Sequence, residues 1–235
     1  MFPVHLGDHI TSAVQGRLAG TPYGDLSKLD LADFLACWPE LHSAALTELG
    51  AERVHPTAQI HPTAIIGDDV LIGPGAKIHE FTTVRHRSVI AAGASVGFNC
   101  EITHAFVGES AVLGHRIGVN RTLVGAGAHL SATVTVAAIH LCDDMTRPDR
   151  EVIMRGTEGL YRCGTTQFGG VIGDGVQTGN NIALGPGIAI GRRTRINSGV
   201  TLAARIVPPD SIITAPHTAD TTVRSRRGIK PGARS

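Results

Sequence analysis

An aliphatic residue recurs at every sixth position through most of this chain, and this repeat constrains the fold more than any other feature. All nine positions of the series 54–102 are Ile or Val. Two five-residue steps follow, to Val107 and Val124, and the six-residue period resumes over 172–202. Of the 21 positions in these series only Thr178 is not aliphatic, so the period belongs to the fold and not to chance.

A period of six fits neither a helix, which repeats every 3.6 residues, nor the alternation of a simple strand. It fits a triangular coil, in which each six residues form one short strand and one tight corner. Three such sides make a coil of about eighteen residues, and successive coils stack about 4.8 Å apart, the spacing of strands in a sheet. We therefore predict an all-β solenoid of about seven coils with parallel strands.

The composition agrees with such a fold. Of 235 residues, 42% are hydrophobic but only 4% are aromatic, so the core must consist of small aliphatic side chains, and 29 glycines suit many tight corners. A formal net charge of +1 gives no overall attraction to nucleic acid or membrane. The four cysteines form no CxxC pair, and neither a signal peptide nor a membrane-spanning run is present. We expect a soluble cytoplasmic protein with reduced thiols.

Residues 1–50 lack the repeat and are predicted to form a separate helical cap. The apolar residues of the segment 29–38 have helical spacing. Asp25 or Ser27 is predicted to cap this helix, and Pro39 to end it. Because the end of a solenoid exposes open strand edges, we expect the cap to cover one end.

The solenoid is predicted to span 51–212, with a loop insertion at 137–171. Long excursions from a compact solenoid are usually functional or mobile. Within the insertion, "REVIMRGTEGLYRC" alternates apolar and polar residues around a turn and predicts a hairpin. The remaining residues, 213–235, form a basic C-terminal tail, which is either a frayed terminus or a strap that contacts phosphates.

Two stretches carry a resemblance to a known family: "FTTVRHRSVIAAGASVGFNCEITHAFVGESAVLGHRIGVN" and "TTQFGGVIGDGVQTGNNIALGPGIAIG". Together they resemble the acetyltransferase domain of bifunctional N-acetylglucosamine-1-phosphate uridylyltransferases and related sugar-1-phosphate nucleotidylyltransferases. The resemblance covers about 54–212. It implies a left-handed parallel β-helix, a homotrimer with sites between chains, and acetyl-CoA or another acyl-CoA as donor, with no metal. No Gly-rich nucleotide motif precedes residue 50, so nucleotidyl transfer is not expected.

The resemblance assigns the general base to His115, which matches the family's Gly-His. A neutral imidazole can accept the proton that an amine loses as it attacks a thioester. Arg85 matches the family's arginine on the sugar phosphate, and a guanidinium fork suits a phosphate. Arg116, directly after the base, is a further candidate for contact with the acceptor. The alternative for His115 and Arg85 is that both are ordinary surface residues.

Other positions depart from the family, so the acceptor pocket is predicted to be rebuilt. The family's second phosphate lysine and its loop lysine match Thr103 and Gln167, and an asparagine that holds the sugar matches His129. With His104, these residues are the candidates for acceptor binding. The acceptor is then a different amine, such as another amino sugar or a specialised-metabolite amine. Further departures occur at Gly118, Ala138 and Ala215, and the candidates near the CoA groove are Asn180 and Ser198.

Two other functions remain open from the residues alone. The lost sugar-binding set would suit a non-catalytic β-helix that binds a ligand or serves as a scaffold. His86 and His104, one coil apart, are expected to stack, and the alternative is a metal pair, as in a carbonic-anhydrase-like hydratase. However, the three-histidine motif of such enzymes fails, because Asn120 stands five residues after His115. We expect a small-molecule amine as partner, and neither nucleic acid nor membrane.

Overall fold

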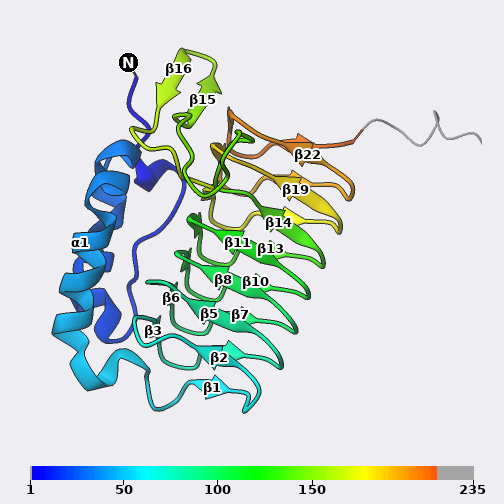
Figure 1. Ribbon diagram of the computed structural model, residues 1–235. Coiled ribbons are helices and arrows are strands. Elements are labelled where there is room, and N and C mark those ends of the chain that lie inside the picture. Colours follow the sequence, from blue (N-terminus) through cyan, green and yellow to red (C-terminus); the bar gives the residue numbers. More distant parts are fainter. Residues whose placement is uncertain (1, 216–235) are drawn as a thin grey trace, which may run out of the picture.

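The computed structural model, described here for residues 2–215, is an all-β solenoid of stacked coils with parallel strands (Figure 1). The fold class predicted from the repeat is confirmed, while the handedness remains a prediction. The first face contains eight strands: β1 (Gln59–Ile60), β4 (Lys77–Ile78), β7 (Ser95–Val96), β10 (Val112–Leu113), β13 (His129–Leu130), β18 (Gln177–Thr178), β21 (Arg195–Ile196) and β24 (Ile212–Ile213).

The second face contains seven strands: β2 (Ile65–Ile66), β5 (Thr83–Arg85), β8 (Glu101–Thr103), β11 (Gly118–Asn120), β14 (Val134–Val136), β19 (Ile182–Leu184) and β22 (Thr201–Leu202). The third face contains nine: β3 (Leu71–Ile72), β6 (Val89–Ile90), β9 (Phe106–Val107), β12 (Thr122–Val124), β17 (Gly170–Ile172), β20 (Ile188–Ile190), β23 (Arg205–Val207), and the hairpin strands β15 (Ile153–Gly156) and β16 (Gly159–Arg162). The number of coils thus differs slightly from the predicted seven.

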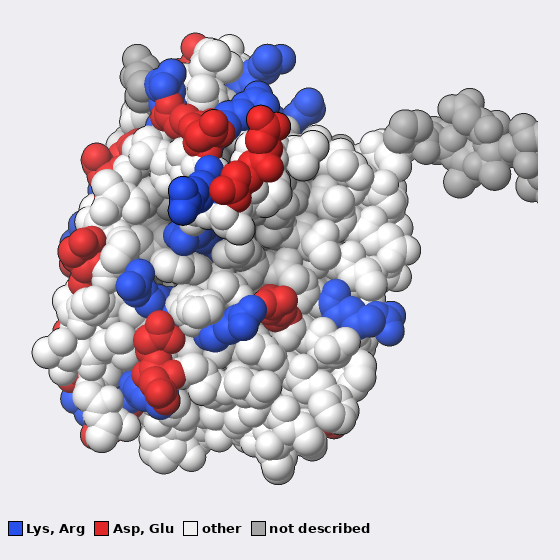
Figure 2. Space-filling model, in the orientation of Figure 1, with Lys and Arg blue, Asp and Glu red and all other residues white. Residues whose placement is uncertain are grey.

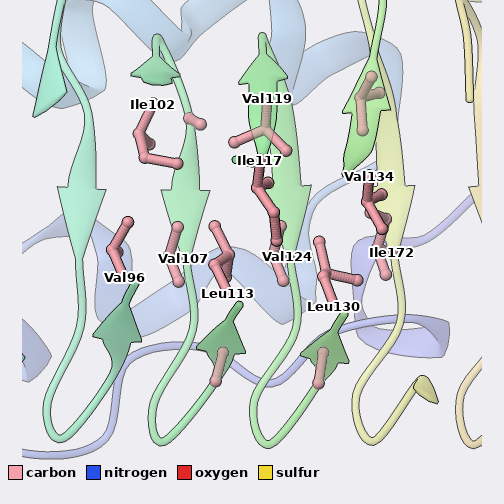
Figure 3. Packing of buried hydrophobic residues seen from close by; sticks show 14 of the residues in the cluster. Val96, Ile102, Val107, Leu113, Ile117, Val119, Val124, Leu130, Val134 and Ile172 are labelled. Carbon is pink, nitrogen blue, oxygen red and sulfur yellow. The ribbon is translucent and has the colours of Figure 1, made fainter. Parts of the chain in front are cut away.

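The repeat positions form the core of the solenoid. Their side chains point inward from all three faces and stack along the axis, as Figure 3 shows for Ile102, Leu113 and Val124. The exception, Thr178, is also buried, and its hydroxyl accepts a hydrogen bond from the Ser131 N–H at 2.9 Å. A polar side chain is tolerated there because its oxygen is satisfied.

The N-terminal helix, α1 (Leu31–Leu49), corrects two expectations. It begins after Asp30, whose carboxylate accepts from the Ala32 N–H at 2.9 Å, so neither Asp25 nor Ser27 is the cap. It also continues through Pro39. A proline removes one helical hydrogen bond, and packing along the rest of the helix outweighs that loss. Short 3-10 helices precede and follow α1: Leu6–Asp8, Arg17–Gly20, Pro22–Lys28 and Gly50–Arg53.

The prediction that the cap covers one end of the solenoid is wrong. The cap lies along the third face instead (Figure 1). The outward residues of this face are apolar and buried, and they form a second core with the N-terminal segment. The ring of Tyr23, for example, stacks on that of Phe106 with centroids 5.6 Å apart. The physical reason is that exposing the fully apolar outer face to water would cost more free energy than exposing the strand edges at one end.

The predicted hairpin is present as the antiparallel pair of β15 and β16, with Gly156 opposite Gly159. It extends the third face beyond β23, through pairing of Arg155 with Arg205. Most of the predicted basic tail, residues 216–235, lies outside the described residues. Across 2–215, none of the helices combines the length and apolar character that a bilayer crossing requires.

Candidate functional site

The predicted base, His115, lies at the corner that joins the first face to the second, between β10 and β11, and is exposed. Its carbonyl accepts from the Thr133 N–H at 2.9 Å, which ties it to the next coil. The preceding coil approaches closely: a Cβ on Gly97 would lie 1.7 Å from the Gly114 carbonyl oxygen. Glycine is therefore required at position 97 for the backbone that carries His115 to stack on its neighbour.

The two candidates for CoA binding, Asn180 and Ser198, lie on the same corner, farther along the axis. The coil after that of His115 contains Ala132 and Thr133, because the Thr133 N–H donates to the His115 carbonyl. The Ala132 N–H in turn donates to the Asn180 side chain at 3.0 Å, so Asn180 lies two coils from His115. That corresponds to about 10 Å along the axis. The Asn180 N–H donates to the Ser198 hydroxyl at 2.9 Å, which places Ser198 one coil beyond.

Arg85 and Arg116 come together on the second face, where they line an open groove of about 450 Å³ with Glu101. Arg85 forms an ion pair with Glu101, and both side chains are about half exposed. An ion pair between exposed groups is weak, so a phosphate could compete for this guanidinium. His129 does not join this groove, since it is exposed on β13 of the first face.

Thr103, His104 and Gln167 lie in a different place, a cleft at the corner between the second and third faces. This cleft has a volume of about 470 Å³ and is open to solvent. The insertion contributes Gln167 and Met145 to its wall, and α1 lies behind it. The predicted candidates for acceptor binding are thus divided between a groove, a cleft and the first face. The remaining residues of the wall are Asp69, His86, Arg87, Asn120, Arg121, Ala138 and Ile139.

The two five-residue steps of the sequence both fall at this cleft. The shortened corners run from Thr103 to Ala105 and from Asn120 to Thr122, and each contains one residue in the left-handed conformation, His104 with φ 52° and Arg121 with φ 47°. The slips therefore shape the second corner and not the corner of His115. Each five-residue step thus places a residue with left-handed backbone conformation at the wall of the cleft.

The imidazole of His104 is half-buried, because the N-terminal helix covers one side of it. Its ring meets that of Trp38 edge to face, with centroids 5.6 Å apart. Burial, as the largest cause, and the nearby guanidinium groups of Arg121 and Arg87 together lower the pKa of His104 to about 4, with smaller contributions from His42 and His86. His104 is therefore neutral at pH 7.

Behind Trp38, a chain of buried hydrogen bonds fixes the position of the helix. The indole N–H of Trp38 donates to the Tyr23 hydroxyl at 3.2 Å, and this oxygen lies 2.7 Å from Nδ1 of His42. The other ring nitrogen of His42 is 2.8 Å from the Asp69 carbonyl oxygen. Because each group in this chain has a partner, the wall of the cleft is held rigidly.

Arg87 and Arg121, the two arginines of the cleft wall, were not among the residues predicted from the sequence. Both are half-buried, and neither forms an ion pair with any carboxylate in the described part of the chain. Burial and the neighbouring Arg87 lower the pKa of Arg121. The five-residue step at Arg121 was the available signal. Figure 2 shows acidic and basic side chains at the top of this view and across its middle, while its bottom centre is mostly uncharged.

His86 and His104 do lie in the same cleft, as the metal alternative requires. Within residues 2–215, however, no three histidine, cysteine, aspartate or glutamate side chains gather closely enough to hold an ion.

The model of the family described as GMPPB C-terminal domain matches residues 49–146. No curated protein sequence matches the chain significantly. Among solved structures, the acetyltransferase domain of PglB from Neisseria gonorrhoeae FA1090 is similar, with 18% identity over 73% of this chain and a TM-score of 0.37. The chain spans only 64% of that domain's length.

Two further structures are similar to this chain. AntD, an N-acyltransferase from Bacillus cereus, is 16% identical over 72% of this chain and 81% of its own, with a TM-score of 0.38. A GDP-perosamine N-acetyl transferase from Caulobacter crescentus is 16% identical over 69% of this chain and 52% of its own, with a TM-score of 0.25.

Proposed function

We propose that this protein is a CoA-dependent N-acyltransferase and that His115 is its general base. The observation that supports this most is the position of His115, exposed at a corner of the solenoid within the stretch that resembles the acetyltransferase family. Asn180 and Ser198 lie on the same corner, about 10 to 14 Å away along the axis. An acyl-CoA lying along this corner would bring its thioester to the imidazole.

In this mechanism the acceptor amine attacks the thioester carbon while the neutral imidazole of His115 takes the amine proton. The C–N bond forms first and gives a tetrahedral intermediate; its collapse breaks the C–S bond, and CoA leaves as the thiol after the protonated His115 imidazole passes it the proton. Backbone N–H groups at the corners would stabilise the oxyanion of the intermediate. We propose that the acceptor lies over the second face, in contact with Arg85 and Arg116. Thr103, His104 and Gln167 are proposed at its far end, and His129 beside the base.

We further propose a homotrimer, in which a neighbouring chain completes the site. Phe81 and Phe98 lie on the corner of His115 and are 59% and 40% exposed. Their rings meet edge to face with centroids 5.8 Å apart. An exposed aromatic pair next to the base suits burial against a second chain. Light scattering would measure a mass of about three chains, and a monomer would contradict this proposal.

Replacement of His115 by alanine tests the mechanism. Acyl transfer should fall at least about a hundredfold while the fold is unchanged. His79→Ala is a matched control, because His79 is an exposed histidine on the same corner, two coils away. A suitable panel combines acetyl-CoA and 3-hydroxybutyryl-CoA with amino sugars. Full activity of His115→Ala would exclude this base. If calorimetry detects no acetyl-CoA binding at millimolar concentration, a non-catalytic scaffold becomes the better interpretation.

A further inference from the structure

We propose that the cleft between the second and third faces is a binding site for the phosphate group of a small molecule, held by Arg87 and Arg121. This proposal deepens the acceptor side of the proposed function, and rests on it only in that the phosphate would belong to the acceptor. Binding itself requires neither CoA nor catalysis. The site is distinct from the corner of His115, because the two corners are separated by the width of the second face.

The first argument is that the two guanidinium groups of the cleft have no carboxylate partner within the described residues. Arg87 and Arg121 both line the cleft and lie close enough for Arg87 to lower the pKa of Arg121. The one acidic residue on the described wall, Asp69, forms an ion pair with neither. Two half-buried guanidinium groups repel each other, and an anion between them would remove that repulsion. The planar forks of two arginines match the oxygens of a phosphate.

The second argument is an unsatisfied polar atom. The hydroxyl oxygen of Thr103 is buried and has no hydrogen-bond partner, and it is the one such side-chain atom in the described residues. Thr103 lines the same cleft as the two arginines. Buried polar atoms in native proteins are nearly always bonded, so an orphan hydroxyl at a wall of a cleft indicates a missing ligand. It would donate to a phosphate oxygen.

The third argument is the neutral polar wall around the cations. Asn120 and Gln167 supply amide groups, and His104 is an uncharged imidazole at pH 7. The volume of about 470 Å³ exceeds that of a single phosphate and lies in the range typical of small-molecule sites. The apolar side chains of Ile139 and Met145 cover part of the wall. The cleft thus suits a phosphate attached to a small organic group.

Trp38 provides the readout, because it is the single tryptophan of the chain and its ring contacts that of His104. A bound phosphate would raise the pKa of His104 against burial, the largest lowering effect, and against Arg121, Arg87, His42 and His86; Asp69 lies on the same wall. A protonated imidazole quenches indole fluorescence more strongly than a neutral one. The probes are inorganic phosphate and pyrophosphate, titrated at constant ionic strength near pH 6.

We expect saturable quenching of Trp38 by the probes, with the apparent Kd raised at least about tenfold by Arg121→Gln and by Arg87→Gln. Arg195→Gln is the matched control, since Arg195 is exposed on the first face and forms no ion pair in the described residues; its Kd should equal that of the wild type. If Arg121→Gln fails to fold, Arg121→Lys and Arg87→Gln still decide the question. The proposal would be overturned if quenching of Trp38 does not saturate as the probe concentration rises, or if the apparent Kd is the same in all variants. The His115→Ala variant should give the same fluorescence titration as the wild type even if it has lost acyl transfer. Failure of the proposed function and failure of this proposal can therefore be told apart.

Discussion

The imidazole of His104 lies edge-on to the indole of Trp38, with ring centroids 5.6 Å apart and planes at 78°. One residue belongs to a shortened corner of the solenoid and the other to α1, 66 positions earlier in the sequence. This contact joins α1, which belongs to the second core, to the wall of the cleft. A change in the charge of His104 therefore affects both the packing of the helix and the occupancy of the cleft.

The free energy of unfolding should decrease as the pH falls from about 6.5 to 4, because His104 becomes protonated more easily in the unfolded chain. Its folded pKa of about 4 lies below its ordinary value of 6.5, so in this window the unfolded chain binds a proton that the folded chain does not. The contribution of neutral His104 to the free energy of unfolding is complete above pH 6.5 and lost as the pH approaches 4. We expect a loss of roughly 1–2 kcal/mol after solvent screening, measured by urea unfolding at several pH values.

His104→Gln isolates this effect from that of other groups, because His9 and His42 also have lowered pKa values through burial. The difference between the two proteins should shrink toward low pH. His115→Gln is the control, since His115 is exposed and should leave the slope as in the wild type. An identical slope in His104→Gln and the wild type would show that His104 titrates normally.

Phe106→Ala should destabilise the protein by about 3–5 kcal/mol, through the cavity it leaves. Phe106 is fully buried although its side chain points away from the solenoid core, because it packs on Tyr23. Leu141→Ala is the control, because Leu141 is 88% exposed, and it should cost less than about 1 kcal/mol. Thermal unfolding measures both, and equal losses would mean that the second core contributes little.

The position of the helical cap was predictable, but the signal lies in the residue before the repeat position. On the third face that residue is also apolar, as in the pairs Leu71–Ile72, Val89–Ile90 and Phe106–Val107. On the other two faces it is mostly polar, as with Lys77 and Glu101. Every third side of the coil is therefore apolar on both surfaces, which requires a cover. A search for the six-residue period alone averages over the three faces and misses this difference.

The cleft is harder to predict from the sequence. Its two arginines and His104 come from three successive coils, and the residues that shield them come from α1 and the insertion. The period places Arg87 and Arg121 on one corner only if the five-residue steps are assigned to that corner. The burial that makes their charges significant depends on the N-terminal segment, whose position the repeat does not contain.

Gly97→Ala should destabilise the corner of His115. A Cβ at position 97 would lie 1.7 Å from the carbonyl oxygen of Gly114, and this backbone oxygen cannot move without displacing His115. We expect a loss of at least about 3 kcal/mol, measured by chemical unfolding. Gly118→Ala is the control, because its Cβ would meet nothing nearer than Thr135 at 3.9 Å and should cost less than about 1 kcal/mol. Equal stability of the two variants would mean that the coils can separate at this corner without cost.

Asp174→Ala should release the first part of the N-terminal segment from the solenoid. The carboxylate of Asp174 accepts from the Thr11 hydroxyl at 2.7 Å, from the Thr11 N–H at 3.1 Å and from the Ala126 N–H at 2.8 Å, so it joins the segment to two coils. Removal leaves these donors without their acceptor, which costs about 2–4 kcal/mol locally. Trypsin should then cut faster after Arg17. Asp68→Ala, which removes a fully exposed carboxylate, should leave the cleavage rate unchanged. Equal rates in Asp174→Ala and the wild type would show that apolar packing on the third face alone holds the segment.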